Sequence, residues 1–242
     1  MANAMANPPA VALVLAGGLG TRMGRPKQFL TLRGRPALYH TLRAFEEADS
    51  VGRVYAVGDR PRVESLAKEA GISKYVGCAE PGPFRQLSTK SGLLLCEEDP
   101  ETVVLVHDGS RCLVTPDLID RIVGAATAED HPDGVVPATP VSDTIKVARG
   151  GEVVKTLDRT ELRAVQTPQA FRLGLLRRLH EAPDEYLGAA TDDASLVERN
   201  GGRVLLIEGD KTNIKLTSPE DLVLAEAILA AREGDPRPGA ST

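Results

Sequence analysis

A glycine-rich segment with two cationic side chains directly follows the first apolar run of the chain. It reads Leu15-Ala16-Gly17-Gly18-Leu19-Gly20-Thr21-Arg22-Met23-Gly24-Arg25-Pro26-Lys27-Gln28. Glycines after a strand let backbone N–H groups approach a phosphate closely, and the following cations add favourable charge. The segment therefore predicts a loop in which Arg22 and Lys27 hold a triphosphate. The alternative is a glycine turn with solvated basic residues, and the coincidence of strand, glycines and both cations argues against it.

Two familiar glycine loops are excluded by single residues of this segment. The dinucleotide fingerprint G-x-G-x-x-G would need glycine where the chain has Met23. The Walker loop needs Ser or Thr after its Gly-Lys pair, whereas Lys27 lies between Pro26 and Gln28. A dinucleotide-dependent oxidoreductase therefore does not fit.

An aspartate closes another apolar run, Thr102 to His107. Ligands of α/β sheets bind at the carboxyl ends of the strands, so Asp108 is a candidate site residue. The alternative is a simple turn former before Gly109. The four histidines show no ligand spacing, and none is assigned to metal binding or to base catalysis.

The elements that must position these residues alternate between strand and helix. Short apolar runs predict buried strands at 11–16, 53–58, 102–107, 134–138 and 203–207. Helical segments are predicted at 36–49, 61–70, after Thr115-Pro116, at 173–181, at 192–200 and after Ser218. This order predicts an α/β fold with a doubly wound, mostly parallel sheet and helices on both faces.

One segment, Asp143 to Lys155, departs from this alternation. It places two polar, β-prone stretches around Arg149-Gly150-Gly151, which predicts a β-hairpin too polar for the centre of a sheet. We expect an arm at about 141–160 that projects from a single domain of residues 8–232, with flexible termini at 1–7 and 233–242.

Composition narrows the function classes. The chain has 242 residues, a formal charge of −5 and only 4 Phe, 4 Tyr and no Trp, which argues against nucleic-acid and membrane-surface binding. The 3 cysteines lie far apart, which favours reduced thiols in a reducing compartment. The apolar run at 10–16 is too short to span a membrane and lacks a basic leader, so we expect a cytoplasmic protein without a signal peptide.

Further motifs connect the glycine segment to a known family. In chain order they are Arg85-Gln86-Leu87-Ser88, His107-Asp108-Gly109-Ser110-Arg111, Pro140-Val141-Ser142-Asp143-Thr144-Ile145-Lys146, Thr167-Pro168-Gln169, Thr191-Asp192-Asp193-Ala194-Ser195 and Asn213-Ile214-Lys215. The glycine segment resembles that of the nucleotidyltransferase superfamily. Together with these motifs, from about residue 10 to 230, the chain resembles the 2-C-methyl-D-erythritol 4-phosphate cytidylyltransferases of non-mevalonate isoprenoid synthesis.

The resemblance implies roles for individual residues. Arg22 and Lys27 match stabilisers of the transition state, and Arg159 and Lys215 match residues that position the acceptor phosphate. Asp108 matches an aspartate on the metal and substrate side, with Mg²⁺ as the expected ion. The nucleotide-contacting positions are Ala16, Gly17, Gly18, Gly20, Gly82, Ser88 and Gly109, and the remaining acceptor-side positions are Arg111, Thr144 and Thr167.

The resemblance also implies partners and leaves alternatives. CTP and a polyol phosphate are the expected substrates, and the arm is expected to form a homodimer in which Arg159 serves the neighbouring subunit. The alternatives are a cytidylyltransferase for another alditol phosphate, such as ribitol 5-phosphate, and a catalytically silent nucleotide-binding module.

The chain departs from the family pattern at three places. Gly109-Ser110-Arg111-Cys112 replaces Ala-Ala-Arg-Pro and is expected to loosen that loop, Pro83 replaces an acidic residue, and four residues separate Arg22 from Lys27.

Overall fold

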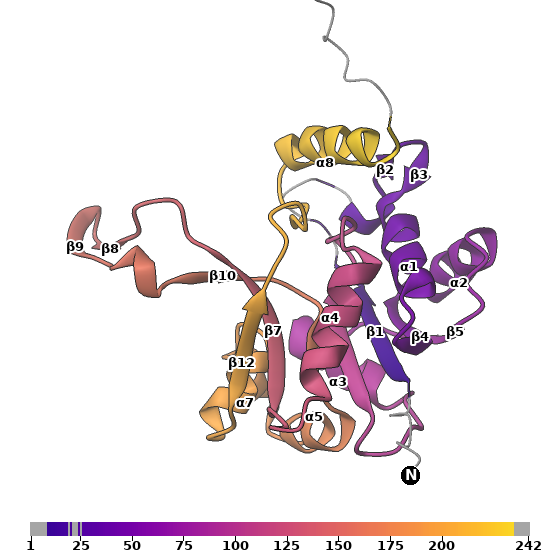
Figure 1. Cartoon of the computed structure of the whole chain (residues 1–242), viewed down its shortest axis with the longest axis horizontal. Helices are drawn as coiled ribbons and strands as arrows, with labels where there is room; N and C mark the ends of the chain where they lie inside the picture. The colour runs from indigo at the N-terminus through magenta and orange to yellow at the C-terminus, as the bar shows by residue number, and fades with distance from the viewer. Residues whose placement is uncertain (1–8, 19, 21–23, 25, 235–242) are drawn as a thin grey trace, which may run out of the picture.

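A computed structural model describes residues 9–18, 20, 24 and 26–234 of the chain, and its centre is an eight-stranded sheet. The path β10-β7-β11-β6-β1-β4-β5 runs through seven of the strands, and β12 pairs with β7 as the eighth (Figure 1). The bounds are β1 Ala10–Ala16, β4 Val51–Gly58, β5 Tyr75–Ala79, β6 Val103–Asp108, β7 Gly134–Pro140, β10 Arg163–Val165, β11 Gln169–Arg172 and β12 Val204–Glu208.

The parallel strands β1, β4, β5 and β6 form one half of the sheet. Side chains alternate across it: Ala12 and Val14 pack in the core on one face, while Val11 and Leu13 pack in the core on the other. A strand buried on both faces reads as a continuous apolar run, which is why the sequence of β1 predicts its position correctly.

Helices cover both faces, as the sequence predicts. One face carries α1 (Ala37–Glu47), α2 (Arg60–Glu69) and α4 (Pro116–Ala126). The other carries α3 (Arg85–Leu93), α5 (Leu173–Leu179), α6 (Asp184–Gly188) and α7 (Asp193–Arg199). The predicted start of α4 is confirmed, since the side chain of Thr115 accepts a hydrogen bond from Leu118 N.

The last helix, α8 (Pro219–Arg232), packs with the two-stranded ribbon β2 (Thr31–Leu32) and β3 (Arg35–Pro36) in a third, smaller core. Its predicted N-terminus is confirmed by a reciprocal capping box between Ser218 and Asp221. Leu216 and Ala225 are fully buried in this core, so the segment after β12 is tied to the main domain.

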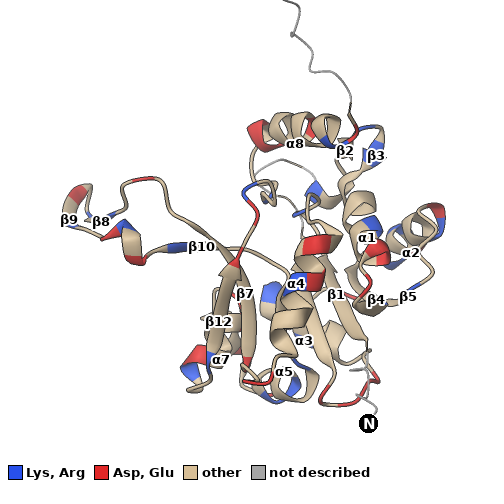
Figure 2. Ribbon diagram, viewed as in Figure 1, with Lys and Arg blue, Asp and Glu red and all other residues tan. Residues whose placement is uncertain are grey.

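The predicted arm leaves the domain as a separate hairpin of β8 (Lys146–Arg149) and β9 (Glu152–Thr156) (Figure 1). Every residue of both strands is exposed, and the turn uses Gly150 and Gly151 with φ of 56° and 86°. In Figure 2 the ribbon of this arm is coloured blue and red at several places, which marks basic and acidic residues along it. The polar composition that predicts an arm thus corresponds to a hairpin with no cover from the described part of its own chain.

The cysteines test a further prediction. Cys78, Cys96 and Cys112 are all buried free thiols, as predicted. Burial raises their pKa values to about 11, 12 and 12, respectively. None of the helices in the described ranges has the length and apolarity needed to cross a membrane.

Candidate active site

A cleft of about 530 Å³ opens at the carboxyl ends of β1 and β6, where ligands of open α/β sheets bind. Two backbone segments and four charged side chains form most of its wall. Its lining consists of Leu15, Gly17, Gly18, Gly20, Lys27, Gln28, Pro81, Gly82, Pro83, Phe84, Arg85, Ser88, Asp108, Ser110 and Lys215. The sheet thus brings together the glycine segment, the Asp108 turn and Lys215, which are far apart in the sequence.

Asp108 is the acidic residue of this lining, and it is paired with two cations. Arg85 Nε donates to Asp108 Oδ1 at 3.1 Å, and Lys215 Nζ donates to Asp108 Oδ2 at 2.7 Å. Burial alone would raise the pKa of Asp108, but Arg85 and Lys215 outweigh that effect and hold the pKa well below its usual range. Asp108 therefore carries its negative charge at neutral pH although the residue is only 8% exposed.

A polar network behind the end of β6 holds the Asp108 backbone in place. Asp108 N donates to Thr167 Oγ1 at 3.1 Å, and Thr167 Oγ1 lies 3.1 Å from His107 Nδ1. His107 Nε2 lies 3.2 Å from Arg111 O. A carbonyl can only accept, so His107 donates from Nε2 and its Nδ1 accepts the Thr167 hydroxyl hydrogen. Burial lowers the pKa of His107 to about 3, which keeps the imidazole neutral.

Arg111 connects this network to the segment that carries Lys215. Its Nη1 donates to Asn213 O at 2.9 Å and its Nη2 to Val165 O at 3.2 Å. Asn213 is fully buried and donates from Nδ2 to Thr167 O at 2.9 Å. Thr167 and Arg111, both predicted on the acceptor side, therefore lie next to Asp108 and brace the loop that places Lys215.

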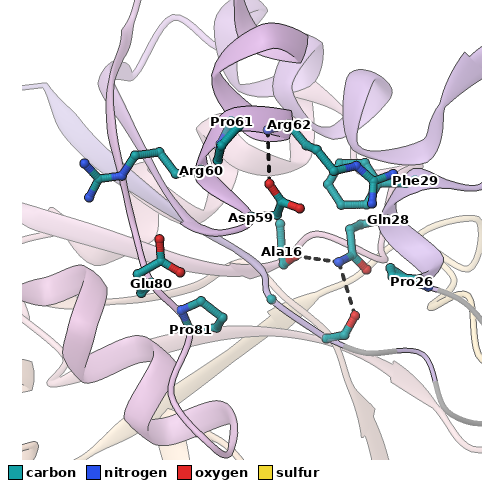
Figure 3. Close-up of a pocket in the computed structure, with 12 residues that line it drawn as sticks. Ala16, Pro26, Gln28, Phe29, Asp59, Arg60, Pro61, Arg62, Glu80 and Pro81 are labelled. Carbon is teal, nitrogen blue, oxygen red and sulfur yellow. Dashed lines mark hydrogen bonds between the residues drawn. The ribbon is translucent and has the colours of Figure 1, made fainter.

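The glycine segment is held by a buried glutamine. Gln28 Nε2 donates to Ala16 O at 2.5 Å and to Gly18 O at 3.2 Å (Figure 3). Gln28 and these carbonyls also line a neighbouring hollow of about 340 Å³, which is bordered by the start of α2. A Cβ on Gly17 would lie 2.3 Å from Pro81 Cβ, so only glycine allows β1 and Pro81 to approach this closely.

Gly82 and Ser88 also line the cleft. Gly82 N donates to Ser88 Oγ at 3.1 Å, which ties the loop before α3 to the first turns of that helix. Gly109 is also held, because its N–H donates to Leu15 O at 2.9 Å and its carbonyl accepts from Thr41 Oγ1 at 3.3 Å. Close packing explains glycine at 109 better than the predicted loosening, since a Cβ there would lie 3.0 Å from Leu15 O.

Two of the predicted residues lie on the arm and not in this cleft. Thr144 is exposed before β8, and Arg159 is exposed after β9 with its Nη1 donating to Ser142 O at 2.7 Å. Arg22 lies outside the described residues. The single chain therefore brings Lys27, Lys215 and Asp108 together and leaves Arg159 apart from them.

Arg85 and Gln28 line the cleft, although the sequence does not predict either as a site residue. In the sequence, Arg85 appears only as part of a motif and Gln28 only as the end of the glycine segment. A buried salt bridge to a residue 23 positions away has no periodic signal in the sequence, so only the fold reveals the role of Arg85.

The fit of a divalent metal rests on Asp108. Among the described residues no cluster of three or more His, Cys, Asp or Glu side chains could hold a metal ion. A single carboxylate is nevertheless a suitable donor for Mg²⁺ when phosphate oxygens and water complete an octahedral shell. The residues present therefore fit a metal that arrives with a polyphosphate, and they do not fit a protein-enclosed metal centre.

Comparison with known proteins relates the chain to one enzyme family. A sequence model of the family described as 2-C-methyl-D-erythritol 4-phosphate cytidylyltransferase matches residues 10–231. The chain is similar to the protein of that name from Rubrobacter xylanophilus, with 68% identity over 93% of this chain and 96% of the relative. The protein of that name from Geobacillus kaustophilus is 47% identical over 91% of this chain and 97% of its own. The crystal structure of the Thermus thermophilus protein, again of that name, superposes with a TM-score of 0.73 at 34% identity, covering 91% of this chain and 98% of the other.

Proposed function

Because the chain belongs to the 2-C-methyl-D-erythritol 4-phosphate cytidylyltransferase family, we propose that its cleft transfers CMP from CTP to 2-C-methyl-D-erythritol 4-phosphate. The products are 4-diphosphocytidyl-2-C-methyl-D-erythritol and pyrophosphate. The chain is thus a cytidylyltransferase of isoprenoid precursor synthesis. The observation that carries the proposal is the meeting of Lys27, Lys215 and the ionised Asp108 with the glycine segment in one cleft.

The reaction needs no general base in the cleft. The acceptor phosphate carries negative charge at neutral pH, so one of its oxygens can attack the α-phosphorus of CTP directly. That new P–O bond forms as the bond from the α-phosphorus to the bridging oxygen of the β-phosphate breaks, and pyrophosphate leaves with the electron pair. The barrier is the approach of two polyanions and the charge that builds on the α-phosphate.

The residues of the cleft are proposed to have separate roles in this reaction. Lys27 lines the cleft together with Gly17, Gly18 and Gly20 and is proposed, with Arg22, to stabilise the charge that develops during transfer. The segment that includes Gly82 and Ser88 is proposed to hold the cytidine. Lys215, whose side chain is 40% exposed, is proposed to bind the acceptor phosphate.

We also propose that Mg²⁺ binds together with CTP. Asp108 would hold it, with phosphate oxygens as the other ligands, and the ion would neutralise part of the charge on the triphosphate. Cytoplasmic localisation is also proposed, because three buried reduced thiols suit a reducing compartment.

A homodimer through the arm is proposed to complete the site. The arm exposes Val147, Val153 and Val154 by 37%, 61% and 56%, an apolar surface that a second copy of the hairpin can cover. Two-fold pairing would carry Arg159 and Thr144 of one subunit to the cleft of the other.

Mixing two inactive variants tests this arrangement. If Arg159 acts in the neighbouring subunit, mixed dimers of Lys27→Ala and Arg159→Ala contain one site with both side chains intact. Random exchange makes about half of the dimers mixed, so roughly a quarter of wild-type activity should return. If Arg159 serves its own subunit, every site lacks one side chain and mixing restores nothing.

The reaction itself is tested by pyrophosphate release from CTP and Mg²⁺ with a panel of sugar phosphates. Release with 2-C-methyl-D-erythritol 4-phosphate well above that with ribitol 5-phosphate is expected. Preference for ribitol 5-phosphate would contradict the acceptor, and no release with any acceptor would favour a silent nucleotide-binding module.

A further inference from the structure

A line of ionisable side chains extends from Asp108 away from the cleft. Arg85 Nε donates to Asp108 Oδ1, and Arg85 Nη1 donates to Asp193 Oδ2 at 2.5 Å. On its other side, Asp193 Oδ1 lies 3.0 Å from His180 Nε2. The side chains of Asp193 and His180 are 0% and 2% exposed, and neither residue lines the cleft.

The two cations on Asp108 differ in how firmly they are held. Arg85 is fixed between two carboxylates, and its side chain is only 21% exposed. Lys215 is 40% exposed, and among the described residues its Nζ has a hydrogen bond only to Asp108. Arg85 is therefore a fixed counter-charge, whereas Lys215 is free to exchange its partner.

We propose that Arg85 is a positioning residue that is anchored on the buried Asp193–His180 pair and stays on Asp108 when Lys215 moves to the acceptor phosphate. This inference rests on the proposed function, in which Lys215 binds that phosphate. Without Arg85, the departure of Lys215 would leave the buried Asp108 carboxylate with no cationic side chain of this chain beside it, which is costly. The fixed arginine removes that cost and leaves the lysine available for substrate.

Arginine suits this role because its planar fork donates in two directions at once and remains charged at all accessible pH values. A lysine at position 85 would keep the charge but could not bridge Asp108 and Asp193 with the same geometry. Asp193 sets the direction of the fork, and His180 in turn holds Asp193 by donating from Nε2. The four residues come from α3, the end of β6, the start of α7 and the residue after α5.

The test compares Arg85→Lys with Arg177→Lys, a matched change remote from the cleft. Arg177 also bridges two acceptors, the carbonyls of Leu93 and Cys96 at the far end of α3. Initial rates are measured with CTP and the acceptor varied in turn. Arg85→Lys should lower kcat/KM for the acceptor by roughly 10-fold or more and change the KM for CTP by less than about 3-fold. Arg177→Lys should leave both kinetic parameters near wild type.

Asp193→Ala removes the carboxylate that anchors Arg85 and replaces no residue of the cleft lining. This variant should show the same loss of kcat/KM for the acceptor as Arg85→Lys. If this variant fails to fold, Arg85→Lys carries the test alone. Wild-type acceptor kinetics in folded Arg85→Lys, or equal losses for CTP and acceptor, would overturn the proposal.

Turnover by the wild-type protein distinguishes a failure of the proposed function from a failure of the proposal for Arg85. If the wild-type protein releases no pyrophosphate, the proposed function fails. Calorimetric titration of 2-C-methyl-D-erythritol 4-phosphate into the CTP complex, in EDTA to prevent turnover, then tests Arg85 by affinity. The proposal requires binding to Arg85→Lys to be weaker than to wild type by roughly 10-fold, and equal binding would overturn it.

Discussion

Gly82 offers the sharpest test of how tightly the cleft is packed where the cytidine is proposed to bind. A Cβ added at this position would lie 2.5 Å from Leu87 Cβ, 2.8 Å from Leu87 C and 3.0 Å from Ser88 N. Two of these atoms are backbone atoms of α3, so they cannot rotate away as the end of a flexible side chain could. Relief to ordinary van der Waals contact requires the loop and the helix to separate by about 1 Å.

This displacement sets the expected magnitudes for Gly82→Ala. Overpacking of this kind costs about 1–3 kcal/mol, and the hydrogen bond from Gly82 N to Ser88 Oγ at 3.1 Å would be stretched or lost. Because a misplacement of about 1 Å in a site can cost about 100-fold in rate, kcat/KM for CTP should fall between about 10-fold and 100-fold.

The matched control is Gly77→Ala in β5, where a Cβ would meet no atom within 4 Å. Alanine in a strand is preferred over glycine by roughly 0.5–1 kcal/mol, so this variant should be as stable as wild type or slightly more stable. Urea unfolding and steady-state kinetics are measured on both variants. If Gly82→Ala matches Gly77→Ala in stability and in CTP kinetics, the loop and α3 can separate without cost, and the predicted overpacking is wrong.

Three further results are expected. Lys27→Ala should lower kcat by roughly 100-fold with a smaller effect on CTP binding, and steady-state kinetics showing only a raised KM for CTP would contradict its role in the transition state. The free energy of unfolding should fall as the pH drops below about 6.5, because His107 becomes protonated in the unfolded chain but, with its pKa near 3, stays neutral in the folded protein. The His107→Gln variant should show a weaker dependence of stability on pH. An unchanged slope in that variant would contradict this role of His107. Cys78, Cys96 and Cys112 should resist a maleimide in the native protein and react fully in denaturant, as mass spectrometry can check; rapid native labelling would disprove their burial.

Local patterns in the sequence determine much of the fold. The apolar run of β1, the Thr115 cap of α4 and the Gly150-Gly151 turn each depend on residues close together in the chain. The sequence does not predict strand β11, although Phe171 is a core residue, because its four residues are too few to show a period. It lies antiparallel between β6 and β7, a position that long-range pairing decides.

For the candidate site, the sequence identifies the groups that handle phosphate but not the way they are held. The types and order of the motifs mark Lys27, Asp108 and Lys215. Only the tertiary structure shows that Asp108 and Lys215, 107 positions apart, form an ion pair, and that Arg85 joins Asp108 to the buried Asp193. The physical reason is that pairing between buried charges depends on distance and burial, and the folded sheet sets both for residues with no local relation in the chain.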